Sequence, residues 1–235
     1  MNELKVKDIY CNCSETKLQN IFYDDKYFDR YKAGGIFGGW AHQSKYAGFI
    51  SKDDEVLDFG CGGGHLLKNI ECRKRIGVEI NPSAAAVAKE NGLEMYRILD
   101  DMPDNYVDKI ISDNALEHTH YPLDELKKMY KKLKPSGKIM MIVPCENICY
   151  KYKSNDIHQH LYSWSPMCIG NLFTLAGFSV IESKSYIHKW PPFHERIAKI
   201  GGRRLFDLLS RICGQIRRKW FQVRIIAEKV PDNGE

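Results

Sequence analysis

A chain of 235 residues is long enough to form one domain with a hydrophobic core, and 43% hydrophobic and 28% charged residues are typical of a globular protein in water. The first residues, MNELKVKD, are polar, and no stretch reaches the ~20 apolar residues that span a bilayer, so we expect neither a secretory signal nor a membrane-spanning helix. A cytoplasmic location, with the eight cysteines as free thiols, follows as an expectation.

The net charge of +5 is concentrated in one segment of the chain. Residues 189–220 contain nine lysines and arginines but only two acidic residues, so the remainder of the chain is slightly acidic. This distribution predicts one basic surface rather than a protein with a general affinity for nucleic acid.

The chain is expected to form one domain, residues 51–235, behind a partly helical lead segment, residues 1–50, that lies over the pocket as a lid. From Glu55 to Lys229, short β-type runs alternate with helical patterns, which predicts an α/β fold with a mostly parallel sheet. Strands are predicted at residues 55–59, 75–79, 94–99, 107–112, 137–143, 178–183 and 222–228.

Capping residues mark the helices between these strands. Asn81 before Pro82 predicts a helix start, and Gly92 predicts the end of the same helix. Apolar residues at helical spacing over 123–133 predict a second helix, with the turn KPSG (134–137) after it. A third helix is expected to begin at Ser165-Pro166 and end at Gly177.

The stretch VLDFGCGGGHLL (56–67) places four glycines directly after the first predicted strand. A strand, a glycine turn and a helix form a small cleft at the carboxyl edge of a sheet. Glycine is required where φ is positive or where a ligand approaches the main chain without meeting a Cβ. The spacing predicts a nucleotide-like ligand, although His65 stands where a dinucleotide-binding loop has its last glycine.

Two carboxylates define the ligand further. Glu79 ends the second predicted strand, 19 residues after Gly60, where a carboxylate accepts both hydroxyls of a ribose. Asp58 precedes the glycine turn, where it would repel a pyrophosphate and attract a cation. The ligand is therefore expected to carry ribose at one end and a positive charge at the other.

These motifs resemble the class I S-adenosylmethionine-dependent methyltransferases, specifically the small-molecule branch of types 11 and 23. VLDFGCGGG is similar to the D-x-G-x-G-x-G loop of that family, GVEIN to the acidic end of its second strand, and LEHT to the element after its fourth strand. LKPSGKIMMIVP and DIHQHLYSWSPMCIGNLFTLAGFSV resemble its fifth strand and the stretch before its sixth. The resemblance covers about residues 50–185 and strand seven.

The resemblance implies a Rossmann-like, doubly wound sheet of seven strands in the order 3-2-1-4-5-7-6, with strand 7 antiparallel. It also implies S-adenosylmethionine as cofactor and S-adenosylhomocysteine as product. The implied cofactor residues are Asp58, Gly60, Cys61 and Gly62 for the methionine end, Glu79 for the ribose, Ile80 for the adenine face, Asp100 or Asp101 for the adenine amino group, and Asn114 and Ala115 for the sulfonium side.

His118 is the candidate general base, because a hydroxyl acceptor must lose its proton and histidine, with a pKa of ~6.5, suits that task. The alternative is that His118 only caps the following turn. Glu117 is its neighbour in sequence, but adjacent side chains do not generally face each other.

The stretch YKYKSNDIHQHLYSW (150–164) is expected to line the acceptor pocket, or else to be only a hydrogen-bonded loop. Its candidate acceptor-binding residues are Tyr150, His158, His160 and Tyr162. Asp156, His158 and His160 alternate, but no fourth ligand is evident, so no metal is expected. Cys11 and Cys13 likewise lack a second pair for zinc and are expected to be surface thiols.

The amphipathic pattern of 205–216, with leucines and isoleucines at helical spacing and arginines between them, predicts a basic helix after a break at Gly201-Gly202. Two interpretations stay open: peripheral contact with an anionic membrane or phosphorylated substrate, or a helix that covers the sheet edge with its charges in water.

The predicted function is methyl transfer to a small or lipid- or carrier-linked molecule, with O-methylation of a sugar-like hydroxyl preferred. Nucleic acid is not expected as acceptor, because the motif after the fourth strand reads SDNAL and lacks the Pro-Pro-aromatic pattern of amino-methylating DNA enzymes. The alternatives are N-methylation of a small amine, a non-catalytic adaptor at a membrane surface, and an NAD-dependent dehydrogenase.

Overall fold

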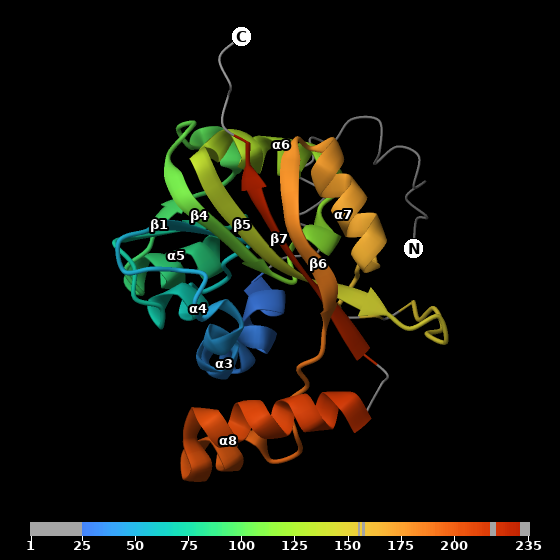
Figure 1. Ribbon diagram of the computed structural model, residues 1–235. Coiled ribbons are helices and arrows are strands. Elements are labelled where there is room, and N and C mark those ends of the chain that lie inside the picture. Colours follow the sequence, from blue (N-terminus) through green and yellow to red (C-terminus); the bar gives the residue numbers. More distant parts are fainter. Residues whose placement is uncertain (1–24, 155, 157, 217–219, 231–235) are drawn as a thin grey trace, which may run out of the picture.

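The computed structural model describes residues 25–154, 156, 158–216 and 220–230. The cysteines at positions 11 and 13, the first half of the lead segment and the basic residues 217–219 lie outside this part of the chain. Within it, seven strands form one mixed sheet (Figure 1). The strands are β1 (Glu55–Phe59), β2 (Lys74–Val78), β3 (Glu94–Tyr96), β4 (Val107–Asp113), β5 (Leu133–Glu146), β6 (Phe178–Tyr186) and β7 (Trp220–Lys229).

The strand order is β3-β2-β1-β4-β5-β7-β6, with β7 antiparallel to β5 and β6 and the other pairs parallel. The predicted fold class is therefore confirmed. Because β1 and β4 are central neighbours whose connections leave on opposite sides, the carboxyl ends of these two strands meet at the switch point where such sheets bind ligands.

Helices of the described chain cover both faces of the sheet, except the last one, which lies away from it (Figure 1). They are α3 (Asp25–His42), α4 (His65–Lys68), α5 (Pro82–Glu90), α6 (Pro122–Lys132), α7 (Pro166–Leu175) and α8 (His194–Ile216), with the 3-10 turns η1 (Gln43–Tyr46), η2 (Leu99–Asp101) and η3 (Leu116–His118). Leu57 packs in the core beneath α6 and α7, whereas its neighbour Val56 packs with Leu67 of α4 on the other face. This alternation is the two-residue period of a strand.

The predicted helix boundaries are confirmed by their caps. The Asn81 side chain accepts a hydrogen bond from the Ala84 N–H at 2.9 Å, and the Ser165 hydroxyl accepts one from the Cys168 N–H at 3.1 Å. Gly177, with φ of +102°, follows α7. Each cap satisfies a backbone donor that the first helical turn leaves open.

β2, β4 and β7 lie within two residues of their predicted bounds, whereas β3, β5 and β6 differ by three or more, and β6 continues to Tyr186 rather than ending at residue 183. β3 stops at Tyr96, because the chain turns into η2 instead of continuing to residue 99. β5 begins at Leu133 rather than Gly137, and the predicted turn is an irregularity inside the strand, where Ser136 has φ of +60° and the pairing with β4 shifts register. A local bulge of this kind looks like a turn in sequence because it uses the same residues.

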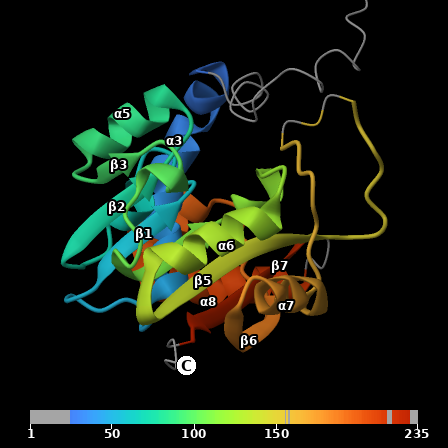
Figure 2. The same ribbon diagram turned by 90° about the horizontal axis from the view of Figure 1, so that it is seen from above.

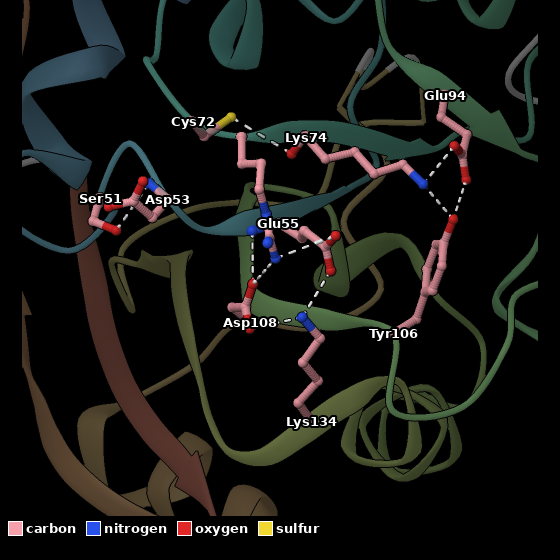
Figure 3. Close-up of polar contacts among 10 residues, drawn as sticks. Ser51, Asp53, Glu55, Cys72, Lys74, Glu94, Tyr106, Asp108 and Lys134 are labelled. Carbon is pink, nitrogen blue, oxygen red and sulfur yellow. Dashed lines mark hydrogen bonds and ion pairs between the residues drawn. The ribbon is translucent and has the colours of Figure 1, made fainter.

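Ion pairs join the strands at the amino edge of the sheet (Figure 3). Lys134 contacts Glu55 at 2.7 Å and Asp108 at 2.9 Å, and Lys74 contacts Glu94 at 2.8 Å. These groups are partly exposed, so each pair contributes at most about 1 kcal/mol. These pairs link the starts of five strands, β1 to β5, and leave the carboxyl edge for other groups.

Helix α8 lies beside α3, away from the sheet (Figure 1). Gly202, with φ of +61°, breaks it, as the sequence predicted. The fully buried Phe206 ring packs against Phe37 and Trp40 of α3, with centroids 5.7 and 5.3 Å apart. Among the described residues, no helix combines the length and apolarity needed to cross a membrane.

Candidate active site

The glycine turn after β1 adopts the conformations that its sequence predicted. Gly60, Gly62 and Gly64 have φ of +71°, +52° and +70°. A Cβ on Gly60 would lie 2.4 Å from the Ala115 Cβ, whereas a Cβ on Gly62 would meet no atom within 4 Å. Gly60 therefore allows close packing of the turn on the end of β4, and Gly62 borders open space that a ligand can enter.

Glu79 lies across the glycine turn. Its Oε2 accepts a hydrogen bond from the Gly62 N–H at 2.9 Å, and its Oε1 accepts one from the Asn81 N–H at 2.8 Å. The structure thus brings together the turn and the carboxylate that the sequence predicted as the two ends of one pocket. A carboxylate oxygen has two lone pairs, so each oxygen can still accept from a ligand hydroxyl.

Buried carboxylates make this pocket electronegative. Burial raises the pKa of Asp58 well above its usual range, and the nearby Asp113 and Glu79 charges raise it further. Burial also raises the pKa of Glu79, although backbone N–H groups partly oppose the shift. Negative groups that destabilise one another are the environment in which a bound cation is favoured. The residues present therefore fit a ligand that carries a positive charge.

The lead segment is anchored at the same edge by a contact that the sequence did not reveal. Lys45 of η1 is buried and its Nζ lies 2.8 Å from the Asp113 carboxylate, while His42 Nδ1 lies 3.2 Å from the same group. The Tyr46 hydroxyl donates to the Ser112 carbonyl at 2.8 Å. Burial alone would raise the pKa of Asp113, but the charges of Lys45 and His42 outweigh it and lower that pKa well below its usual range. No periodicity or motif marks Lys45 in sequence.

The remaining candidate cofactor residues lie in several environments. Asn114, with φ of +55°, donates to Asp113 at 2.6 Å and accepts from Gln222 of β7 at 3.1 Å. Asp100 pairs with Lys128 of α6 at 2.8 Å, and Asp101 beside it is exposed. Ile80 is half-buried directly after Glu79.

A second polar cluster follows β4. The Glu117 carboxylate is fully buried in η3, and the Nε2 atoms of His118 and His160 each lie 3.9 Å from its Oε1. Contrary to the general expectation for adjacent side chains, Glu117 and His118 face the same space, because η3 turns tightly at the end of the strand. The other nitrogen of His160, Nδ1, lies 2.8 Å from Glu146 Oε1.

The environment of this cluster shifts the pKa values of two groups. Burial raises the pKa of Glu117 to about 8. Burial, followed by the neighbouring His160, lowers the pKa of His118 to about 4. At pH 7 the His118 imidazole is therefore neutral, although the lowered pKa makes it a weaker base than an ordinary histidine, and the protonated Glu117 carboxyl avoids the cost of an isolated buried charge.

The stretch before α7 carries the candidate acceptor residues (Figure 2). The backbone N–H of Leu161 donates to the Glu117 carbonyl at 3.0 Å, which fixes His160 beside His118, with ring centroids 5.0 Å apart. The exposed His158 ring lies 5.6 Å from His160, and the Tyr162 hydroxyl donates to the His120 carbonyl at 3.0 Å. Tyr150 is exposed in the outer part of the loop, at 54%.

Sequence comparisons identify the family of the chain. The family described as "Methyltransferase domain" matches residues 36–183, which is more than half of the chain and includes both polar clusters. A ubiquinone/menaquinone biosynthesis C-methyltransferase of Neisseria gonorrhoeae is 29% identical over 126 residues, 47% of this chain and 51% of that protein. A ubiquinone biosynthesis O-methyltransferase of Pseudomonas putida is 32% identical over 98 residues, 36% of this chain and 42% of that protein. The match thus spans about half the length, or less, of these relatives.

Solved structures share the fold at low identity. A chain from the Haloferax volcanii complex of the Trm112 activator with a methyltransferase superposes with a TM-score of 0.62 at 20% identity, covering 86% of this chain and 97% of that one. A Haemonchus contortus phosphoethanolamine N-methyltransferase gives a TM-score of 0.64 at 18% identity, covering 94% of this chain and 61% of that one. Fold, glycine turn and family match agree, and the chain belongs to the class I S-adenosylmethionine-dependent methyltransferases.

Proposed function

We propose that this protein transfers a methyl group from S-adenosylmethionine to an oxygen of a small or carrier-linked molecule, with a sugar-like hydroxyl as the preferred acceptor. The observation that supports it best is the cluster of Glu117, His118 and His160 beside Ala115, at the carboxyl end of β4. A hydroxyl must lose its proton as it is methylated, so it needs a proton acceptor nearby. An amine only has to be unprotonated when it binds.

The cofactor is proposed to lie over the open side of Gly62. Asp58, Gly60, Cys61 and Gly62 would hold its methionine end, and the electronegative pocket would favour its sulfonium. The Glu79 oxygens would accept from the ribose hydroxyls while they keep their bonds to the Gly62 and Asn81 N–H groups. Ile80, Asp100 or Asp101 would border the adenine, and Asn114 and Ala115 the sulfonium side.

Catalysis would depend mainly on alignment. S-adenosylmethionine, when bound, would supply a methyl group on a positively charged sulfur, and the residues of the site would hold the acceptor oxygen in line with that methyl group. His118 would accept the hydroxyl proton on an imidazole nitrogen. His158, His160 and Tyr162 would orient the acceptor, and Tyr150 would contact its outer part.

An acceptor screen tests the reaction. The full chain is incubated with methyl-labelled S-adenosylmethionine and matched pairs of hydroxyl, amine and carbon acceptors, including phenols and sugars linked to a phosphate. Products are read by mass, and the proposal predicts label on oxygen. Label on nitrogen alone favours the N-methyl alternative. Binding of NADH instead of S-adenosylhomocysteine would point to a dehydrogenase, and binding of neither would favour the adaptor.

We further propose that α8 brings the protein to an anionic membrane surface of the cytoplasm. The apolar stripe of α8 is formed by Leu208, Ile212 and Ile216, from the amphipathic pattern predicted over 205–216. These three side chains are 55%, 43% and 77% exposed, so they do not pack on the rest of the described chain. They lie on the face opposite the buried Phe206 and Gly214, and the exposed Arg204 and Arg211 flank them. An exposed apolar stripe with flanking arginines complements anionic lipid headgroups and acyl chains.

A further inference from the structure

The buried Glu117 carboxylate is the least satisfied polar group of the site. Its side chain is 0% exposed, and neither oxygen accepts a hydrogen bond from any part of the chain that the structure describes. A buried carboxylate without a donor is costly, and native proteins retain one where a proton or a cation compensates it. A proton or a cation is therefore expected beside Glu117.

The Glu117 carboxylate faces two imidazoles. One ligand atom each from Glu117, His118 and His160 lie within 4.8 Å of one another, and both Nε2 atoms are 3.9 Å from Glu117 Oε1. Three ligands about 2.0–2.2 Å from one tetrahedral ion are about 3.4 Å apart, so each imidazole must approach the Glu117 oxygen by about 0.5 Å and the two imidazole nitrogens must approach each other by at most about 1.4 Å. Two imidazoles and one carboxylate form a known catalytic zinc set that leaves one position open.

A second carboxylate supports the same interpretation. Glu146, at the end of β5, contacts His160 Nδ1 at 2.8 Å, and this directs Nε2 toward Glu117. Carboxylate–histidine–metal arrangements are typical of protein metal sites, because the outer carboxylate fixes the tautomer and orientation of the ligating ring. Glu117, His160 and Glu146 come from three separate segments. The Leu161 N–H to Glu117 carbonyl bond joins the first two, and the Glu146 N–H donates to the Ser163 hydroxyl at 2.7 Å, which joins the third.

We infer that Glu117, His118 and His160 form a site for a divalent transition-metal cation of the zinc type, oriented by Glu146. Mixed nitrogen and oxygen donors suit such a cation, whereas magnesium and calcium prefer oxygen ligands. The alternating Asp156, His158 and His160 showed no fourth ligand in the sequence, because Glu117 and His118 lie far from His160 along the chain. The fold brings them beside His160. What the cation does rests on the proposed function: at the open position it would bind the acceptor hydroxyl and promote loss of its proton to water. With the cation bound, His118 would be a ligand, and the base role proposed above would belong to the metal-free protein.

The test is binding of Zn²⁺ to the full chain after chelator treatment and dialysis, measured by calorimetry, with the visible spectrum of Co²⁺ as a second readout. We expect one high-affinity site. Glu117→Gln and His160→Ala should each weaken it at least about 100-fold, and Glu146→Gln about 10–100-fold. His120→Ala, in the turn after His118 but outside the three ligands, should bind as wild type.

Circular dichroism of each variant establishes that it is folded before titration, and Glu146→Gln tests the site without removing a ligand. Absence of stoichiometric binding by the wild type overturns the inference. So does binding that persists in Glu117→Gln and His160→Ala, since this places the ion on surface thiols or other histidines. The titration does not involve methyl transfer, so a failed acceptor screen and a failed metal site are distinguishable.

Discussion

At the scale of single residues, Gly62 carries two separable properties. Its φ of +52° is costly for any residue with a Cβ, and the space beside it is open. Gly92, which ends α5, has φ of +88° and also meets no atom within 4 Å, but it lies outside the proposed pocket. The two glycines therefore both have a positive φ and open space beside them, but only Gly62 borders the proposed cofactor pocket.

Gly62→Ala is expected to destabilise the fold by about 1–2 kcal/mol and to raise the Kd for S-adenosylhomocysteine at least about tenfold, because the new methyl group enters the ligand's space. Gly92→Ala should lose similar stability and keep its affinity. Urea unfolding and calorimetry measure the two effects. If the two variants bind S-adenosylhomocysteine with equal affinity, the cofactor does not bind at this turn.

His118→Ala tests the chemistry beside that pocket. Loss of the proton acceptor, or of a metal ligand, should lower kcat for a hydroxyl acceptor about a hundredfold or more, while the Kd for S-adenosylhomocysteine stays within about twofold. His120→Ala is the matched control and should keep its activity. Unchanged turnover of His118→Ala would leave the histidine with a structural role only.

At the scale of elements, the lead segment is joined to the sheet by one buried ion pair. The side chains of Lys45 and Asp113 are 1% and 9% exposed, so η1 and the end of β4 depend on each other for charge neutralisation. Removing one partner of such a pair leaves an uncompensated buried charge, which costs more than the intact pair contributes. The lid interpretation of the lead segment stays a prediction, and this contact supports it.

Asp113→Asn is expected to lower the free energy of unfolding at pH 7 by about 3–5 kcal/mol. Because the folded pKa of Asp113 lies below the unfolded value, its stabilisation is present above pH ~4 and lost as pH falls through the folded pKa, so wild type and variant should converge in acid. Urea unfolding between about pH 7 and about pH 3 measures the beginning of this loss, and the difference between wild type and variant should narrow below about pH 4. Asp124→Asn, at an exposed pair in α6, should cost under about 1 kcal/mol. A difference that does not narrow below about pH 4 contradicts the assignment.

At the scale of the whole molecule, α8 has one face that packs against no other part of the described chain. Its inner face, with Phe206 and Gly214, packs on the protein, while the stripe of Leu208, Ile212 and Ile216 points outward. The helix therefore buries a face with one large apolar side chain, Phe206, beside Ser210 and Gly214, and exposes the wider apolar stripe. A helix that merely covered a sheet edge would bury the wider one.

The wild-type chain is expected to co-sediment with vesicles containing anionic phospholipid and to be released by salt, because screening weakens the arginine contacts. Leu208→Glu with Ile212→Glu should abolish binding and leave the unfolding midpoint unchanged. Leu175→Glu, an equally exposed leucine of α7, is the control and should bind as wild type. Binding that survives the double change would rule out this stripe.

Local features of the sequence predicted the elements of the fold and the glycine turn of the candidate site. Strand periodicity, the caps at Asn81 and Ser165, and the glycine turn with Glu79 act within a few residues or at one sheet edge, so their spacing predicted these elements, whereas the strand order and the candidate cofactor residues came from the family resemblance that the motifs carry. Contacts between distant segments were decided only by the tertiary structure: Lys45 on Asp113, His160 on Glu117, and the outward stripe of α8. Each of these contacts depends on which surfaces meet after folding. Periodicity does not predict this, because neither the burial of a lysine nor the exposure of a leucine can be read from the residues beside it in sequence.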